Sequence, residues 1–502
     1  MGKEYATTRI RGNNVVDRTH SGLTSATFVT RKGFFYAAFL VVMVICAHLL
    51  LAPWPYNMLP FALIGGVSIV FLTFRYPIIG LHLYLIIFLI RPQELFPNVA
   101  LMHYPYEKIV GIIVIVSLIL TYLVKGRKFE LFDIDKGVLL FVAAAALSVI
   151  PAVWVGGAKE VFIIFFKVIL AYLFIARIVD TQGKFRGIIW LYVLSVGFIA
   201  LSSTINYYTG NFEVAMGIQR ATGPGGQEGA LSDPNSMAAT LALGIPFIFF
   251  LMKTQRNRFL WLLLALLILA CLWTVVISGS RGGMLGCIVM LMFIGLTSKY
   301  KVPAIIAVVC VVTVFAVVMP EQYIERFTTI AHFDNLDDMT GAAHSAQGRI
   351  KGLKVGFEIL LHRPLTGVGI GCFSAYNHVH HGSWLQPHNM LGQLVGELGL
   401  IGLLAFGFFI FKLVSNIKFI RSELRKHNLE KDFNFQIATA CMISVALLFF
   451  LGLFGHNLYR FNWYLIASFV VIMARLVQGR FQSKDVVQTE TASATVELTT
   501  YT

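Results

Sequence analysis

The sequence contains little charge. Only 13% of its 502 residues are Asp, Glu, Lys or Arg, whereas 57% are hydrophobic, and an ordinary soluble domain carries roughly 25% charged residues. The mean hydropathy of +0.76 agrees with this composition. The shortage of charge excludes a soluble globular fold and predicts an all-α integral membrane protein.

Cysteine is scarce, and the signatures of several enzyme classes are missing. No CxxC spacing occurs, and no P-loop, protein-kinase motif set, GxSxG elbow or HExxH pair is present. These absences argue against an ATP-driven pump, and we expect no cofactor. The six cysteines are scattered, so we interpret them as packing residues rather than as a disulfide framework: Cys46, Cys271, Cys287, Cys310, Cys372 and Cys441.

Acidic residues are nearly absent from the apolar segments, and no convincing internal repeat is visible. Secondary transporters usually contain such repeats, together with broken helices and acidic residues near the middle of the membrane. A polysaccharide flippase or transporter is therefore kept only as the non-enzyme alternative.

Long apolar segments, in contrast, are abundant. A helix needs about 20 apolar residues to cross roughly 30 Å of hydrocarbon, and this measure predicts about 12 to 14 transmembrane helices, of which the third is short. They lie at about 34–52, 57–74, 77–90, 109–124, 137–155, 161–178, 187–206, 236–252, 259–278, 282–298, 302–319, 390–414, 436–455 and 461–477.

The basic residues predict the orientation of these helices. With the N-terminus inside, the inner connections and tails hold more than twice as many of the 40 lysines and arginines as the outer connections, as the positive-inside rule predicts. This asymmetry explains the net charge of +15 without a nucleic-acid partner. We therefore expect cytoplasmic tails at 1–33 and 478–502, transmembrane helices over 34–319 and 390–477, and a periplasmic loop at 320–389.

Two outer connections, 207–235 and 320–389, are long enough to carry function. Within the second, residues 348–362 combine apolar residues at helical spacing with basic residues between them. This pattern predicts an amphipathic helix that lies on the membrane interface. Pro364 and the glycines of LTGVGIG would end it.

Arginine on the outer side runs against the positive-inside rule and therefore suggests function. Arg281 lies in SGSRGG, in a very short connection between two apolar helices, which places its guanidinium at the membrane interface. Small neighbours allow a ligand to approach closely, and the planar guanidinium suits phosphate oxygens. An interfacial anchor or a helix-pairing charge is the simpler alternative.

Arg220 lies in RATGPGGQEGALSDPNSMA, just before an apolar helix. Asp233 or Asn235 could cap that helix and direct its amide donors to the outer face, where an anion would be favoured. An ordinary turn with a solvated arginine explains the same pattern equally well.

His388 lies in QPHNMLGQLVGELGLIG, where the long loop re-enters the membrane. A histidine has an ordinary pKa near 6.5, so His388 is a candidate to accept a proton from a hydroxyl nucleophile. A hydrogen-bonded interfacial histidine is the alternative. Lys167, within VFIIFFKVILAYLF, is either a snorkelling residue or a pyrophosphate contact.

A cluster of histidines in NHVHHGSW raises the hypothesis of a metal site. Neither its spacing nor that of a nearby acidic run matches a zinc or calcium loop, so no metal is expected. The residues weighed are His378, His380, His381, His388, Asp334, Asp337 and Asp338.

Taken together, these segments resemble the bacterial O-antigen ligase and polymerase superfamily. The elements that carry the resemblance are SGSRGG between two helices, GR followed by the amphipathic helix and RPLTGVGIG, and HN a few residues before ELGLIG. The GALSDPN segment and the early RPQELFP also look like segments of that superfamily. The resemblance is strongest over residues 215–402.

The resemblance implies a metal-independent, inverting glycosyltransferase of the GT-C kind in the bacterial inner membrane. It would move a glycan from a polyprenyl (undecaprenyl) diphosphate carrier to an acceptor hydroxyl at the periplasmic face. Arg281, Arg220 and Arg349 of the GR element would bind the pyrophosphate, with Lys167 as a further contact, and His388 would be the catalytic base.

The acceptor is not decided by any residue. We favour lipid A-core, which would make the protein an O-antigen ligase of lipopolysaccharide biosynthesis. An O-antigen or exopolysaccharide polymerase and a protein O-oligosaccharyltransferase are the alternatives within the same superfamily.

Overall fold

The structure is a computed structural model, and it describes residues 59–95, 106–126, 130–215, 218–225, 231–298, 301–318 and 341–500. The predicted tail at 1–33, the predicted helix at 34–52, part of the RPQELFP segment and the acidic run near Asp334 lie outside the described residues. Within the described part the chain is helical apart from one short hairpin, as expected for an all-α integral membrane protein.

The elements in chain order are α2 (Leu59–Arg75), α3 (Pro77–Ile90), α4 (Pro92–Leu95), α5 (Tyr106–Lys125), α6 (Asp133–Val149), α7 (Val155–Ile178), α8 (Gln182–Tyr208), β1 (Glu213–Ala215), β2 (Ile218–Arg220), α9 (Pro234–Met252), α10 (Arg258–Ile277), α11 (Arg281–Leu296), α12 (Lys301–Val318), α14 (Gly341–His362), α15 (Phe373–His381), α16 (Met390–Lys426), α17 (Phe433–Gly452) and α18 (Phe461–Thr500). Strands β1 and β2 pair antiparallel, with Glu213 opposite Arg220.

The predicted transmembrane segments correspond to helices wherever they fall on described residues. Eight helices in the described part are long and apolar enough to cross a membrane, and four more apolar helices are shorter, namely Ile64–Arg75, Pro77–Ile90, Arg281–Leu296 and Lys301–Cys310. The predicted 137–155 segment is too long at its C-terminal end, because the helix there ends at Val149 and the next begins at Val155. Helices α16 and α18 continue well past their predicted ends, to Lys426 and Thr500.

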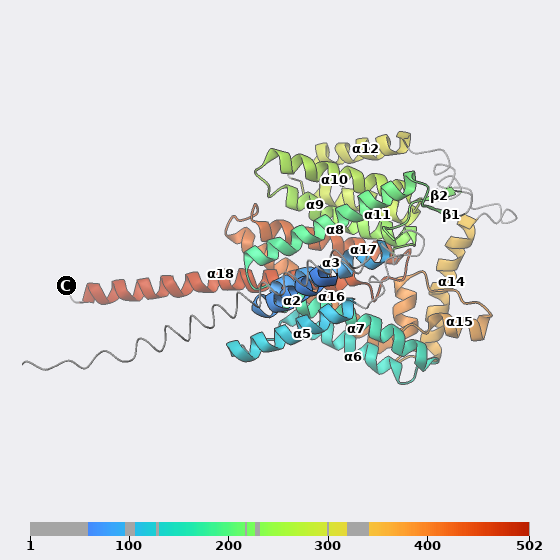
Figure 1. Ribbon diagram of the computed structural model, residues 1–502, viewed down its shortest axis with the longest axis horizontal. Helices are drawn as coiled ribbons and strands as arrows, with labels where there is room; N and C mark the ends of the chain where they lie inside the picture. The colour runs from blue at the N-terminus through green and yellow to red at the C-terminus, as the bar shows by residue number, and fades with distance from the viewer. Residues whose placement is uncertain are drawn as a thin grey trace, which may run out of the picture. The chain divides into compact units, whose positions relative to one another are not determined.

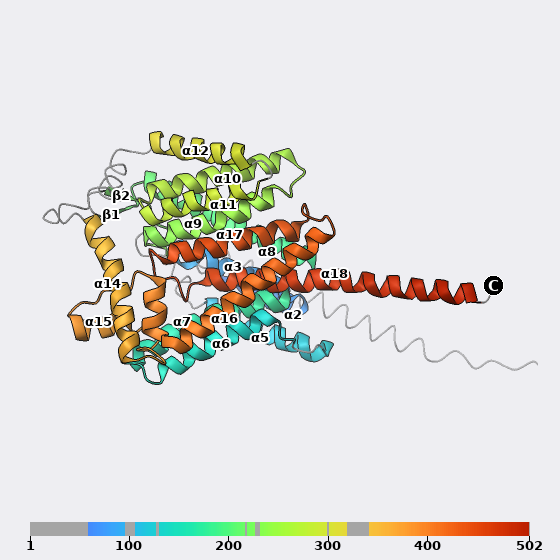
Figure 2. The same cartoon turned by 180° about the vertical axis from the view of Figure 1, so that it is seen from behind.

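Large side chains fill the interior between these helices. Trp463, Tyr464 and Phe469 of α18 are completely buried, and α18 packs on α7 while α17 packs on α9. Figures 1 and 2 show these helices running in roughly the same direction.

A buried ion pair joins α6 to α7. The Arg177 guanidinium donates to Asp135 over 2.7 Å, and the Tyr172 hydroxyl donates to the same carboxylate over 2.5 Å. Both charged side chains are almost completely inaccessible to solvent. Each therefore depends on the other for the neutralisation of its charge.

The predicted amphipathic helix is α14, and both ribbon views show it lying across one end of the helices, beside α15 and the β1–β2 hairpin (Figures 1 and 2). Val355 and Ile359 are buried, whereas Phe357 and Leu361 on its outer side are exposed. Such a two-sided helix suits a membrane interface. It ends at His362, shortly before Pro364, as expected.

Helix α14 packs closely on the first turns of α16 through four glycines. A Cβ atom added to Gly356 would lie 2.5 Å from the carbonyl oxygen of Gly392, and one added to Gly352 would lie 2.0 Å from that of Pro387. Gly396 completes this contact. Only hydrogen atoms fit between the two backbones here.

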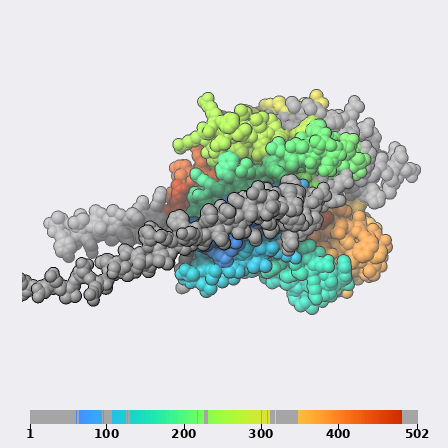
Figure 3. All heavy atoms as spheres, in the orientation of Figure 1, coloured from blue at the N-terminus to red at the C-terminus, as the bar shows by residue number. Residues whose placement is uncertain are grey.

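Helix α16 is interrupted at Gly399, whose φ of 60° and ψ of −155° lie outside the helical region. The amide of Leu400 donates to the carbonyl of Pro364 over 2.8 Å, and that of Gly369 donates to the carbonyl of Glu397 over 3.0 Å. The segment after α14 thereby stabilises the interruption of α16 through backbone hydrogen bonds. The same segment contacts the end of α6, where the amide of Ile370 donates to Ser148, and Figure 3 shows the surfaces of the two regions adjoining at one end.

Candidate functional site

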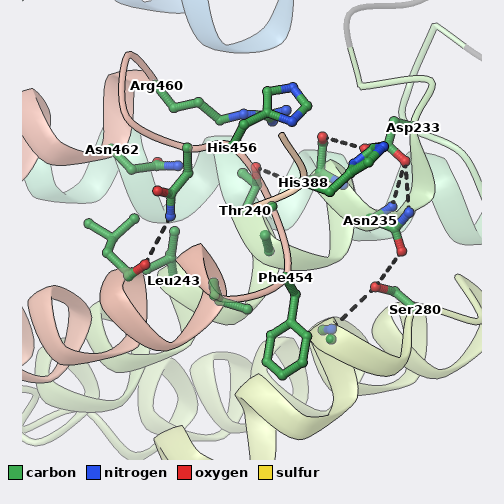
Figure 4. Close-up of a pocket in the computed structure, with 18 of the residues that line it drawn as sticks. Asp233, Asn235, Thr240, Leu243, Ser280, His388, Phe454, His456, Arg460 and Asn462 are labelled. Carbon is green, nitrogen blue, oxygen red and sulfur yellow. Dashed lines mark hydrogen bonds between the residues drawn. The ribbon is translucent and has the colours of Figure 1, made fainter. Parts of the chain in front are cut away.

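A cavity of about 450 Å³ lies where several helices begin or end on the side of α14. Its wall is built from the start of α9, the α10–α11 turn, α14, the residue before α16, and the α17–α18 connection (Figure 4). The lining residues are Asp233, Asn235, Ser236, Ala239, Thr240, Leu243, Ser280, Gly282, Gly283, Arg349, His388, Leu448, Leu451, Phe454, Gly455, His456, Asn457, Arg460 and Asn462.

Asp233 caps α9, which is one of the two caps, Asp233 or Asn235, that the sequence predicts. Its carboxylate accepts hydrogen bonds from the amides of Asn235 and Ser236 at 3.1 and 3.0 Å, and from the Ser236 hydroxyl at 2.6 Å. Desolvation opposes the ionisation of Asp233, but these hydrogen bonds outweigh it and lower its pKa. Asp233 is therefore an anion in this cavity and a poor proton acceptor.

Arg220 contacts the capped start of α9. Its guanidinium donates to the Asn235 side chain over 3.2 Å and to the carbonyl of Ser278 over 3.0 Å, and it lies 3.7 Å from Glu213. Only 7% of Arg220 is exposed. The alternative of a solvated arginine is thereby excluded, although Arg220 does not itself line the cavity.

Arg281 begins α11, directly after the turn that closes α10. Gly279 in this turn has a φ of 60°, a conformation that glycine adopts without strain. Ser280 caps α11 and donates to the Asn235 side chain over 2.9 Å. Arg281 is half-buried and lies close enough to Arg220 for the two guanidinium charges to interact.

Arg349 reaches the same cavity from α14. Its guanidinium lies over the Phe454 ring, 5.4 Å from the ring centre, in the arrangement of a cation–π contact. Desolvation and the positive charge of Arg281 lower the pKa of Arg349. The glycine contact between α14 and α16 fixes this arginine relative to His388.

His388 lines the cavity directly before the Asn389 cap of α16. Its φ is 43°, and a non-glycine residue held in this region is a sign of functional constraint. Desolvation and the charge of Arg349 lower the pKa of His388, although Asp233 acts in the opposite direction. The imidazole is consequently neutral near pH 7 and can accept a proton.

A second histidine lies beside the first. The rings of His388 and His456 are 5.8 Å apart. Desolvation, Arg460 and His388 lower the pKa of His456 to about 4, and Asp233 opposes them. His456 is therefore also neutral near pH 7, and its Nδ1 atom is buried with no hydrogen-bond partner in the described part of the chain.

Buried polar contacts hold the α17–α18 connection against α16. The Tyr459 hydroxyl donates to the Glu397 carboxylate over 2.8 Å, and the amide of Leu458 donates to the Gln393 side chain over 3.4 Å. Only 2% of Glu397 is exposed. The segment that carries His456 and Arg460 is therefore fixed to the helix that follows His388.

Two other sequence candidates lie elsewhere. Lys167 is half-buried within α7 and does not line this cavity. The three histidines of the NHVHHGSW segment are exposed and contact neighbours of their own: His378 stacks on Trp384, His380 on Tyr376, and His381 lies 3.2 Å from Glu358. Among the described residues, no three metal-ligating side chains gather.

Sequence reasoning missed His456 as a candidate and counted Arg460 only as one of the outer basic residues. Arg460, like Arg281, is an arginine in a short connection on the predicted outer side, where positive charge is disfavoured. The GHNLYRFN segment therefore contained a signal that could have been used.

A family model described as O-Antigen ligase matches residues 266–407, which include Arg281, Arg349 and His388. No curated protein matches the chain.

Proposed function

We propose that the chain is a glycosyltransferase of the O-antigen ligase and polymerase superfamily, as the family-model match over residues 266–407 supports, and that it moves a glycan from a polyprenyl diphosphate, such as undecaprenyl diphosphate, to an acceptor hydroxyl. The observation that carries the proposal is the cavity, which His388 lines together with Arg349 and Arg460. Arg281 does not line the cavity but lies between two residues that do, Ser280 and Gly282. Donors for a leaving anion and a base for a nucleophile are thus available together.

The arginines would neutralise the leaving group. When the bond between the anomeric carbon and the diphosphate oxygen breaks, its electron pair stays on that oxygen, and the negative charge there increases. Arg281 and Arg349, supported by Arg220, are positioned near one another despite their mutual repulsion. A bound polyanion would relieve that repulsion, which is why we assign this side of the cavity to the diphosphate.

His388 would activate the acceptor. The acceptor oxygen attacks the anomeric carbon as its proton passes to an imidazole nitrogen of His388, and the products are the new glycoside and polyprenyl diphosphate. One displacement inverts the anomeric configuration. Asp233 is a weaker candidate for the base because its pKa is lowered.

We propose a metal-independent reaction because guanidinium groups can supply the charge neutralisation that a divalent ion supplies in other transferases. Transfer should therefore persist in EDTA. Loss of transfer in EDTA and its return on addition of Mg²⁺ would contradict this part of the proposal.

The site would face the periplasm from the bacterial inner membrane, with both termini in the cytoplasm. The distribution of basic residues supports this orientation, and α14 with its exposed apolar side chains would lie on the outer surface of the bilayer. A lipid-linked donor requires a site at that depth.

For the acceptor we propose lipid A-core, which makes the protein an O-antigen ligase. The first experiment supplies purified full-length protein with polyprenyl-diphosphate glycan and, separately, lipid A-core, free glycan chains and an acceptor protein. Glycan on lipid A-core would support the ligase. Longer polyprenyl-linked chains would indicate a polymerase, glycosylated protein would indicate an oligosaccharyltransferase, and no glycosidic bond with any acceptor would favour a flippase.

Two substitutions test the residue roles in the same assay. Arg281→Ala and His388→Ala should each lower the rate of transfer at least about 100-fold, a typical loss for a group that stabilises charge or transfers a proton. Arg256→Ala is the matched control, because Arg256 is exposed in the α9–α10 connection and does not line the cavity. Undiminished transfer by either test variant would remove the role assigned to that residue.

A further inference from the structure

The proposed chemistry gives Arg460 no role. Arg460 lines the cavity, and in the described part of the chain no hydrogen bond or ion pair engages its guanidinium. Its amide donates to the carbonyl of Asn457 over 3.2 Å, and the neighbouring Tyr459 is tied to Glu397. Arg460 is exposed, and the charge of Asp233 acts on it without a direct ion pair. A cation on a fixed backbone that lines a cavity in this way is a candidate ligand-binding group.

Two of the three other arginines lie at the part of the cavity wall that contains Asn235 and Ser280, since Arg220 contacts Asn235 and Arg281 directly follows Ser280. Arg220 contacts Asn235 and the α10–α11 turn, its charge acts on Arg281, that of Arg281 acts on Arg349, and that of Arg349 acts on His388. These three guanidinium groups form a continuous series that ends at the base. Their combined charge suits a diphosphate.

Arg460 belongs to the other side. Its charge acts on His456, whose ring neighbours His388, and the group that acts on Arg460 is Asp233. Figure 4 shows the same order, with Arg460 and His456 at one side, His388 and Asp233 next, and Asn235 and Ser280 beyond them. His456, His388 and Asp233 thus lie between Arg460 and the part of the wall that contains Asn235 and Ser280.

We propose that Arg460, with His456 beside it, binds a negatively charged substituent of the acceptor sugar, either a phosphate or a carboxylate. This inference rests on the proposed function, in which His388 must touch both the acceptor hydroxyl and the region of the reacting carbon. Because the diphosphate occupies the arginine series on one side of His388, the acceptor occupies the other side, where Arg460 lies.

The neighbours of Arg460 suit an anion held in one orientation. The buried Nδ1 atom of His456 has no protein partner in the described residues, so a polar ligand atom would satisfy it. Asp233 repels an anion that approaches the centre of the cavity. The anionic substituent would consequently bind at Arg460 and leave an uncharged hydroxyl near His388.

A purely structural role makes a different prediction. If Arg460 only balances the charge of Asp233, its loss should weaken all ligands alike, whatever their charge. A binding site for an acceptor anion instead requires a loss that is confined to charged sugars. The experiment therefore compares ligands of different charge on one side of the cavity with pyrophosphate on the other.

The full-length protein in detergent is first saturated with inorganic pyrophosphate and then titrated with glucose 6-phosphate, glucuronate or methyl glucoside. We expect wild type to bind at least one of the two anionic sugars about tenfold more tightly than methyl glucoside, as the loss of one charge-assisted hydrogen bond implies. Glucose 6-phosphate alone would identify the substituent as phosphate, and glucuronate alone would identify it as carboxylate.

The variants separate the two sides. Arg460→Gln should abolish the preference for anionic sugars and leave pyrophosphate binding intact, which also shows that the protein is folded, and Arg460→Lys should restore part of the preference. Arg349→Gln should weaken pyrophosphate binding and keep the preference. A wild type without any preference for anionic sugars, or an Arg460→Gln protein that retains it, would overturn the inference.

Failure of this inference can be distinguished from failure of the proposed function. Wild-type protein that binds neither pyrophosphate nor a polyprenyl-diphosphate glycan, or that transfers no glycan, would remove the proposed function. Loss of the charge preference in a protein that still transfers glycan would remove the Arg460 inference alone.

Discussion

The contact between α14 and the start of α16 leads to a quantitative prediction for Gly356→Ala. The new Cβ would lie 2.5 Å from the carbonyl oxygen of Gly392, whereas ordinary contact begins at 3.4 Å, so the two backbones must separate by about 0.9 Å. Gly356 lies two turns after Arg349 on one helix, and Gly392 lies one turn after His388 on the other. The separation therefore moves the proposed leaving-group contact away from the proposed base.

The expected cost is large for a single methyl group. A displacement of about 1 Å in a catalytic arrangement can lower the rate about 100-fold, whereas overpacking costs about 1–3 kcal/mol of stability. Helix propensity alone favours alanine over glycine by roughly 1 kcal/mol, so intrinsic helix stability cannot explain a loss. We expect Gly356→Ala to retain its folded yield and to lose about 100-fold in kcat/KM for glycan transfer.

The assay measures transfer rate and thermal unfolding of each variant in the same detergent. Gly348→Ala is the matched control, since its Cβ would meet nothing closer than Leu385 at 3.8 Å, although Gly348 directly precedes Arg349. A Gly356→Ala protein with wild-type transfer would show that the spacing of α14 and α16 does not control the reaction. Equal losses in both variants would point to helix flexibility instead.

Two further predictions concern stability and pH. Asp135→Ala should destabilise the folded protein by about 3–5 kcal/mol, because it removes the carboxylate that neutralises the buried Arg177 charge. Asp133 is exposed, so Asp133→Ala is the control; an unfolding temperature that falls less in Asp135→Ala than in Asp133→Ala would contradict this prediction. The transfer rate should fall as the pH falls through the lowered pKa of His388, because a protonated imidazole is no longer a base. The Arg349→Gln variant lacks one cause of the lowered pKa, so its transfer rate should decline at a higher pH than that of wild type. A decline at an unchanged pH would contradict the coupling of the two residues.

The helices could largely be predicted from the sequence. Apolar length located the spans, and the helical spacing of apolar residues before Pro364 located the helix that lies across them, although that helix begins at Gly341 rather than near residue 348. The interruption of α16 was not foreseen. Gly399 lies in a segment as apolar as any continuous span, and only its contacts with the Pro364 carbonyl and its neighbours show that the helix breaks there.

The candidate site could be predicted only in part. Arg281, Arg349 and His388 were recognisable from local motifs, but nothing in a local pattern shows that the α17–α18 connection meets the start of α9, more than 200 residues earlier. That meeting depends on buried partners such as Glu397 and Tyr459, which read in the sequence as ordinary members of apolar helices. Lys167 was a candidate that does not line the cavity. Its place within a span does not show which side of α7 faces the cavity.

The position of Arg460 also has a consequence for biosynthesis. The wall formed by residues 454–462 is the last part of the cavity to leave the ribosome, and it takes its place only when α17 has entered the bilayer and Tyr459 has met Glu397. A chain that is still being translated therefore has arginines and a histidine but no closed cavity. Newly inserted, incomplete copies would therefore remain inert even in a membrane that already contains the proposed lipid-linked donor.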